Sequence, residues 1–141
     1  MNQKRKINDE RGFVAHILKN TDPSYFTLTG GIAEVYASLC YPGQMKGWHY
    51  HHRMNMVYTC VQGIAQVVVA DPSLDEMRYR THFIGEGVDA CISIPAQTWN
   101  AFRAVGNTPC LIINCTDMVH DPEEIMRKRD IEMDYKWDQN I

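Results

Sequence analysis

Short β-rich runs separated by turn residues are the feature of this sequence that most constrains its fold. Eight runs rich in β-branched and aromatic residues can be traced, at 32–41, 48–51, 56–61, 64–70, 78–84, 90–94, 101–105 and 110–115. Turn dipeptides such as Pro42-Gly43 and Gly106-Asn107 follow several of them. This spacing predicts an all-β sandwich or barrel rather than strands that alternate with helices.

Only the C-terminal segment, residues 121–133, carries helix signals. Asp121 is a good N-cap, Pro122 suits the first helical position, and Glu123 and Glu124 complement the helix dipole. We therefore expect one short helix there. We expect residues 1–8 and the last few residues to be loosely ordered.

Size and charge limit the classes of function. With 141 residues, 45% of them hydrophobic, the chain suits a single domain over 1–141. The formal net charge is −3 and the basic residues form no stripe, so we expect no nucleic-acid partner. No apolar run is long enough for a membrane span, and the polar start of the chain does not resemble a secretory signal.

Cysteine usage bears on the compartment. The five cysteines are an odd number without a close CxxC pair: Cys40, Cys60, Cys91, Cys110 and Cys115. Such a set favours reduced, buried thiols over a disulfide framework, and we expect a cytoplasmic protein.

The chemistry is concentrated around His49 and His51. Alternate residues of a strand point to the same face, so both imidazoles are expected to enter one cavity, whereas Tyr50 and His52 point the other way. Trp48 precedes this pair, and an aromatic ring there is suited either to stacking on a sugar or base or to burial in a packed core.

This stretch resembles the first motif of the cupin superfamily, because Gly43, His49, His51 and Gly63 match its spacing. Met56 stands where that motif has a glutamate. The resemblance implies a cupin double-stranded β-helix, that is, a jelly-roll barrel.

The second cupin motif, a proline turn ahead of a third metal-binding histidine, corresponds to residues 95–100, where Asn100 replaces the histidine. Only two strong ligands remain, so we expect no metal cofactor. A metal, if one were bound, would be held by His49 and His51.

A closer resemblance covers about residues 9–128, to the short cupins related to dTDP-4-dehydrorhamnose 3,5-epimerase. The matching residues are Asp9-Glu10-Arg11-Gly12, Tyr41-Pro42-Gly43, Lys46-Gly47-Trp48-His49-Tyr50-His51, Phe83-Ile84-Gly85-Glu86, Ile94-Pro95, Val105-Gly106-Asn107, Asn114 and Asp121-Pro122. The resemblance implies an isomerase of nucleotide-sugar metabolism that needs no cofactor, because a 4-keto group already acidifies the neighbouring C–H bonds.

The same resemblance assigns roles. A histidine at the position of His49 removes the carbon-bound proton, a task for which an imidazole has a suitable pKa. The family's lysine, which stabilises the enolate, falls on or next to Met56, its proton-returning tyrosine on or next to Ile113, and a further histidine on Asn100. Several family positions are thus replaced.

We therefore expect His49 and His51 as catalytic residues, with His51 or Asn100 polarising the carbonyl. The residues expected to bind the substrate, a nucleotide sugar or a similar carbonyl metabolite of polysaccharide or natural-product biosynthesis, are Lys46, Trp48, Tyr58, Trp99, Asn100, Arg103 and Asn114.

Two alternatives remain at this point: a metal-dependent cupin that uses His49 and His51, and a binding module that has kept the barrel and lost the reaction. We also expect a homodimer, in which the segment 13–18 supplies the interfacial strand, because open sheet edges are commonly covered by subunit pairing.

Overall fold

The structure is a computed structural model in which residues 1–72 and 75–140 are described. Its strands are β1 (Asn2–Gln3), β2 (Lys6–Asp9), β3 (Gly12–Ala15), β4 (Glu34–Cys40), β5 (Met45–His51), β6 (Met56–Gln62), β7 (Ile64–Asp71), β8 (Arg78–Gly85), β9 (Ala90–Ile94), β10 (Trp99–Ala104), β11 (Cys110–Thr116) and β12 (Ile125–Arg127). Short 3-10 turns complete it: η1 (Pro23–Thr27), η2 (Pro122–Glu124), η3 (Asp130–Glu132) and η4 (Trp137–Asn140). All eight predicted runs form strands.

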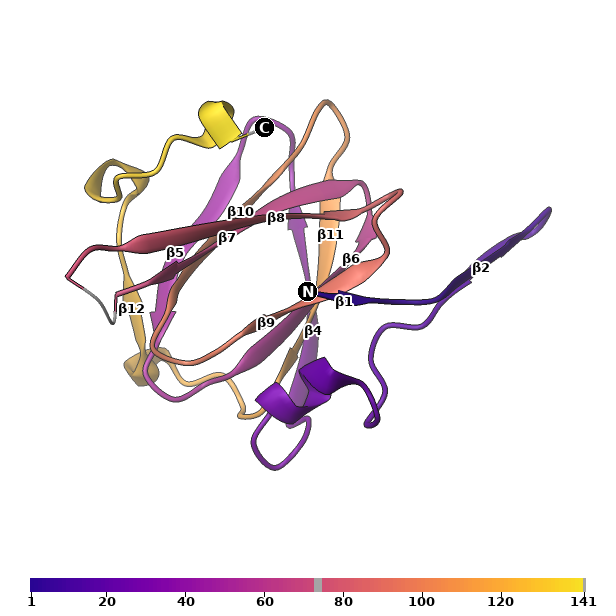
Figure 1. Cartoon of the computed structure of the whole chain (residues 1–141), viewed down its shortest axis with the longest axis horizontal. Helices are drawn as coiled ribbons and strands as arrows, with labels where there is room; N and C mark the ends of the chain where they lie inside the picture. Colours follow the sequence, from indigo (N-terminus) through magenta and orange to yellow (C-terminus); the bar gives the residue numbers. More distant parts are fainter. Residues whose placement is uncertain (73–74, 141) are drawn as a thin grey trace.

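Two five-stranded antiparallel sheets face each other as a jelly roll (Figure 1). Their strand orders are β1-β9-β6-β11-β4 and β12-β5-β10-β7-β8. The hairpin β2–β3 projects away from this barrel (Figure 1). The predicted all-β jelly-roll class is confirmed, whereas paired strands occupy most of the N-terminal segment expected to be loosely ordered.

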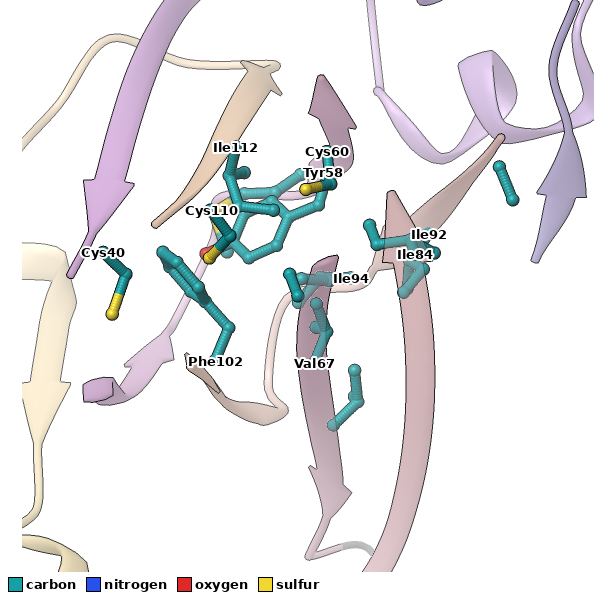
Figure 2. Close-up of a cluster of buried hydrophobic side chains, with 14 of the residues drawn as sticks. Cys40, Tyr58, Cys60, Val67, Ile84, Ile92, Ile94, Phe102, Cys110 and Ile112 are labelled. Carbon is teal, nitrogen blue, oxygen red and sulfur yellow. The ribbon is translucent and has the colours of Figure 1, made fainter. Parts of the chain in front are cut away.

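The alternation of side chains in each strand builds the core. Along β10, Asn100, Phe102 and Ala104 point between the sheets, and the residues between them point outward. The central cluster fills the space between the sheets with aliphatic, aromatic and cysteine side chains (Figure 2). All five cysteines are free and buried.

The C-terminal segment covers the outer face of the β5-containing sheet. Trp48 is fully buried there against Tyr135 and Trp137, and its indole Nε1 donates to the Asp130 carboxylate at 2.8 Å. The outer face is thereby shielded from water by aromatic side chains.

The predicted C-terminal helix is wrong. Asp121 does cap a turn by accepting a hydrogen bond from the Glu123 backbone N–H, but that turn, η2, spans only three residues. The chain then enters β12 and pairs with β5 through Ile125, Met126 and Arg127. Backbone pairing at the open edge of β5 overrides the local helix signals. Asn140 ends the last described turn, and Ile141, part of the tail expected to be loosely ordered, lies outside the described residues.

The opposite sheet is covered by the N-terminal segment. Leu28, which follows η1, packs on Val57, Cys91 and Cys115 on the outer face of this sheet. Among the described residues, no helix has the length and apolarity needed to cross a membrane.

Candidate active site

A cavity opens between the sheets where β4, β5, β6, β10 and β11 meet. It encloses about 90 Å³ and is lined by Tyr36, Ser38, Lys46, His49, Tyr58, Asn100, Phe102, Ile112 and Asn114. Tyr58, Phe102 and Ile112 also belong to the hydrophobic core and give the cavity an apolar wall (Figure 2). A cavity with polar groups on one side and apolar side chains on the other is typical of a small-molecule site.

A register shift in β5 decides which side chains enter this cavity. Asn100 pairs with His49, but Ala101 pairs with Gly47, so Trp48 is an extra residue between them. Lys46 and His49 therefore both face inward, although they are three positions apart. Gly47 is required here, because its φ is +134° and an added Cβ would lie 2.5 Å from the Cβ of Ala101.

His49 is half-buried in the cavity wall. Burial lowers its pKa to about 4, with further lowering by the positive charges of Arg127 and His51. Arg127 lies in register with His49 on the neighbouring strand β12. At neutral pH the His49 imidazole is therefore uncharged and able to accept a proton.

The side chain of His51 points to the same face of β5 as that of His49, but it already contacts another side chain of the protein. Its Nδ1 contacts the carboxylate of Glu124, which also accepts hydrogen bonds from the backbone N–H groups of Arg53 and Met54. Burial raises the pKa of Glu124, but these hydrogen bonds outweigh it and hold the pKa below its ordinary value. His51 is buried and is not among the residues that line the cavity.

A hydrogen-bonded chain crosses the cavity floor. The Tyr58 hydroxyl donates to Oδ1 of Asn100 at 3.1 Å, and Nδ2 of Asn100 donates to the backbone carbonyl of His49 at 3.2 Å. Burial raises the pKa of Tyr58, which stays protonated. Asn100 thus ties β6 and β5 together and holds the backbone of the candidate base.

Tyr36 and Ser38 are cavity residues that the sequence reasoning missed. Tyr36 accepts a hydrogen bond from Nδ2 of Asn114 at 2.8 Å, and Ser38 accepts one from Nζ of Lys46 at 3.0 Å. A signal was available: both residues alternate with the buried Cys40, which places them on the inner face of β4. Burial raises the pKa of Tyr36, and the Asn114 hydrogen bond partly offsets this.

Three predicted substrate-binding residues lie elsewhere. Trp48 and Trp99 are buried on the outer face of the sheet, and Lys128 lies over the Trp99 ring. Arg103 also points outward, where it donates to Gln66 and Asp138 and packs over Trp137. These three residues lie on the face of the sheet that points away from the cavity. They pack against neighbouring side chains and do not contact a ligand in the cavity. Of the predicted set, the structure brings together Lys46, His49, Tyr58, Asn100 and Asn114.

The donor set does not suit the metal that other cupins hold at this place. His51 is bonded to Glu124, and Asn100, at the position of the third ligand, uses its amide on Tyr58 and a backbone carbonyl. Across residues 1–72 and 75–140, no group of three or more His, Cys, Asp or Glu side chains is arranged to hold a metal ion.

Known proteins resemble this chain in sequence and in fold. Spore coat polysaccharide biosynthesis protein SpsL of Bacillus subtilis is 29% identical over 127 residues, which are 88% of this chain and 82% of that protein. Agl13 of Haloferax volcanii, described as a probable low-salt glycan biosynthesis epimerase, is 28% identical over 120 residues, which are 82% of this chain and 75% of that one.

Among solved structures, a dTDP sugar isomerase from Desulfovibrio desulfuricans G20 superposes with a TM-score of 0.87 at 28% identity, covering 97% of this chain and 88% of that one. The family model described as FdtA, WxcM-like, C-terminal matches residues 1–136. This match spans nearly the whole sequence, and the chain therefore belongs to the FdtA, WxcM-like C-terminal family of cupin-fold proteins.

Proposed function

We propose that this chain is a metal-independent isomerase or epimerase that moves a proton on a carbon next to the ketone of a nucleotide-activated keto-sugar. The observation that carries the proposal is His49, a neutral imidazole at the wall of a partly apolar cavity between the two sheets. An uncharged imidazole accepts a proton, and the low local polarity strengthens the interactions that stabilise an enolate.

Different residues around the cavity carry out the successive steps of such a reaction. His49 takes the carbon-bound proton and becomes an imidazolium, and the electron pair moves onto the ketone oxygen as an enolate. The ammonium of Lys46 supplies positive charge for that oxygen. Tyr36 then returns a proton to carbon, and solvent restores both groups to their starting protonation states.

The relatives support one class of substrate. SpsL is named for polysaccharide biosynthesis, Agl13 as a probable epimerase, and the structural neighbour as a dTDP sugar isomerase. We infer a nucleotide sugar as the ligand and a role in polysaccharide or natural-product biosynthesis. The five free, buried cysteines support a cytoplasmic location, where thiols stay reduced.

Solvent deuterium exchange tests the proposal most directly. The protein is incubated in D₂O with dTDP-4-keto-6-deoxyglucose, and deuterium on the sugar carbons next to the ketone is followed by NMR. We expect wild-type exchange and a loss of about 10² to 10⁴-fold in His49→Ala, the range for removing a positioned general base. The carbon that becomes labelled, and any shift of the ketone, distinguish epimerisation from ketone migration.

His52→Ala is the matched control, because His52 lies close in sequence but is exposed and outside the cavity lining. Its exchange rate is expected to equal that of the wild type. Equal exchange in wild type and His49→Ala, or none in either, would remove the catalytic proposal and leave the cavity as a binding site.

We also propose that the protein is a homodimer. The hairpin β2–β3 projects from the barrel and exposes Ile7, Phe13 and Val14, while the outer edge strand β4 exposes Val35 and Leu39. Apolar side chains of this kind on a projecting strand and on an unpaired sheet edge suit pairing with a second copy. Light scattering after size exclusion tests this, with Phe13→Asp expected to shift the mass towards the monomer.

A further inference from the structure

Asn114 on β11 occupies an unusual position in the cavity wall. The residue is only 2% exposed, and its Nδ2 group donates to the hydroxyl oxygen of Tyr36 at 2.8 Å and to the sulfur of Met56 at 3.2 Å. Its Oδ1 is buried and has no hydrogen-bond partner in the described part of the chain. A buried acceptor without a donor is costly, and cavity-lining groups left in this state are candidates for ligand contacts.

The surroundings favour this orientation of the amide. The opposite orientation would place Oδ1 against the Met56 sulfur, and neither atom carries a proton to donate. In the observed orientation both Nδ2 protons are used. The Tyr36 oxygen accepts one of them, so the phenolic proton of Tyr36 is not consumed in this contact and can be given to a substrate.

We propose that Asn114 couples substrate recognition to proton transfer: its Nδ2 holds Tyr36 with the phenolic proton free, and its Oδ1 accepts a hydrogen bond from a substrate hydroxyl. This inference rests on the proposed function. Oδ1 and Nδ2 belong to one amide, so the hydroxyl lies beside the carbon that Tyr36 protonates. The ligand is then a ketone with a hydroxyl on a neighbouring carbon, and an acceptor such as Oδ1 selects it over a deoxy carbon or an ether.

Ligand binding tests the recognition half. Calorimetry compares dTDP-6-deoxyglucose, a stable analogue of the keto-sugar, with its 2-deoxy and 3-deoxy forms, on wild type and on Asn114→Leu. We expect the wild type to lose roughly tenfold to a hundredfold in affinity for one deoxy form, as for an unpaired buried acceptor. Asn114→Leu should bind that form and the parent compound equally. The proposal is overturned if the wild type binds both deoxy forms as tightly as the parent compound. It is also overturned if Asn114→Leu still binds the parent compound more tightly than that deoxy form.

Titration of Tyr36 tests the positioning half without any ligand, so it stays informative if the proposed function fails. Tyrosine ring carbons are labelled with ¹³C, and the Tyr36 signal is assigned by its loss in Tyr36→Phe. Asn114→Leu removes a donor to the phenolate and should raise the pKa of Tyr36 by about one unit or more. An unchanged or lowered pKa would show that Asn114 does not donate to Tyr36.

The matched control is Ile113→Val, because Ile113 lies next to Asn114 on β11 and is not part of the cavity lining. It should leave both the titration and the ligand preference unchanged. Failure of the parent dTDP-6-deoxyglucose to bind would count against the proposed function, whereas the titration alone then decides the role of Asn114.

Discussion

Strand β5 presents two contrasting faces to the rest of the molecule. Its inner face carries Lys46 and His49, which border about 90 Å³ of open cavity. Its outer face carries Trp48, which is fully buried among aromatic rings of the C-terminal segment. One face leaves room for a ligand, and the other is packed around Trp48, with Met45 and Tyr50 partly buried beside it.

This contrast shows how a small barrel can keep a polar cavity without losing stability. Burying large aromatic side chains contributes more free energy than most other contacts, and here it is placed where no ligand has to enter. The inner face is then free to hold titratable groups that contribute little to packing. Variants of the two faces should therefore have separable effects.

The largest expected effect is on the outer face. Trp48→Ala removes a fully buried ring and its bond to Asp130, and should lower the free energy of unfolding by about 3–5 kcal/mol. Urea denaturation measures it. Trp48→Phe keeps most of the packing and should lose less. If Trp48→Ala instead left stability intact and abolished ligand binding, the division between the two faces would be incorrect.

On the inner face, Tyr36→Phe should reduce turnover by about 10²-fold, because it removes the proposed proton donor. Tyr36 is 37% exposed, but the variant leaves Nδ2 of the buried Asn114 without its acceptor, so the free energy of unfolding should fall by about 1–2 kcal/mol. The measurement is kcat with dTDP-4-keto-6-deoxyglucose beside a denaturation curve. Full activity in this variant would assign the proton return to another group.

Glu124 supports the inner face from outside the cavity. Glu124→Gln keeps the shape but loses the charge that binds His51 and two backbone N–H groups, and should cost about 2 kcal/mol of stability at pH 7. The pKa of Glu124 is below its usual value, so its contribution is present above about pH 4.5. It is lost as the pH falls through the folded-state pKa. Unfolding curves at pH 7 and pH 3 should show the gap between wild type and variant shrinking.

The smallest effect concerns the charge beside His49. The pKa of His49, about 4 in the ligand-free protein, should rise by roughly half a unit in Arg127→Gln, because a neighbouring positive charge is lost. Arg127 is exposed, so added salt should reduce the difference between the two proteins. NMR titration of the His49 ring measures both. A pKa near 6.5 in the wild type would mean that burial does not control this imidazole.

The strands were predictable because their signals are local. Alternation of apolar residues and turn dipeptides such as Pro42-Gly43 act within a few residues, and each predicted run became a strand. The helix signals after Asp121 were just as local. The chain nevertheless forms a strand there, because the open edge of β5 offers backbone hydrogen bonds. Local preference decides only where no stronger long-range pairing competes.

The candidate site was only partly predictable for a similar reason. His49 was found from its motif, and simple alternation already places Trp48 outward, but the extra residue there reverses the alternation before it and turns Lys46 inward. Glu124 lies 73 residues from His51 along the chain, and no local sequence signal near His51 predicts their contact. Tyr36 could have been placed by alternation with Cys40 and was missed.

The sequence by itself determined the class of fold and the family, because periodicity, turns and the motif around His49 depend on residues close together in the chain. Only the tertiary structure decided which side chains contact one another: Tyr36 with Asn114 and Lys46 with Ser38 in the cavity, and His51 with Glu124 outside it. These pairings join distant strands, and their geometry depends on sheet register and one bulge, which local sequence signals do not specify.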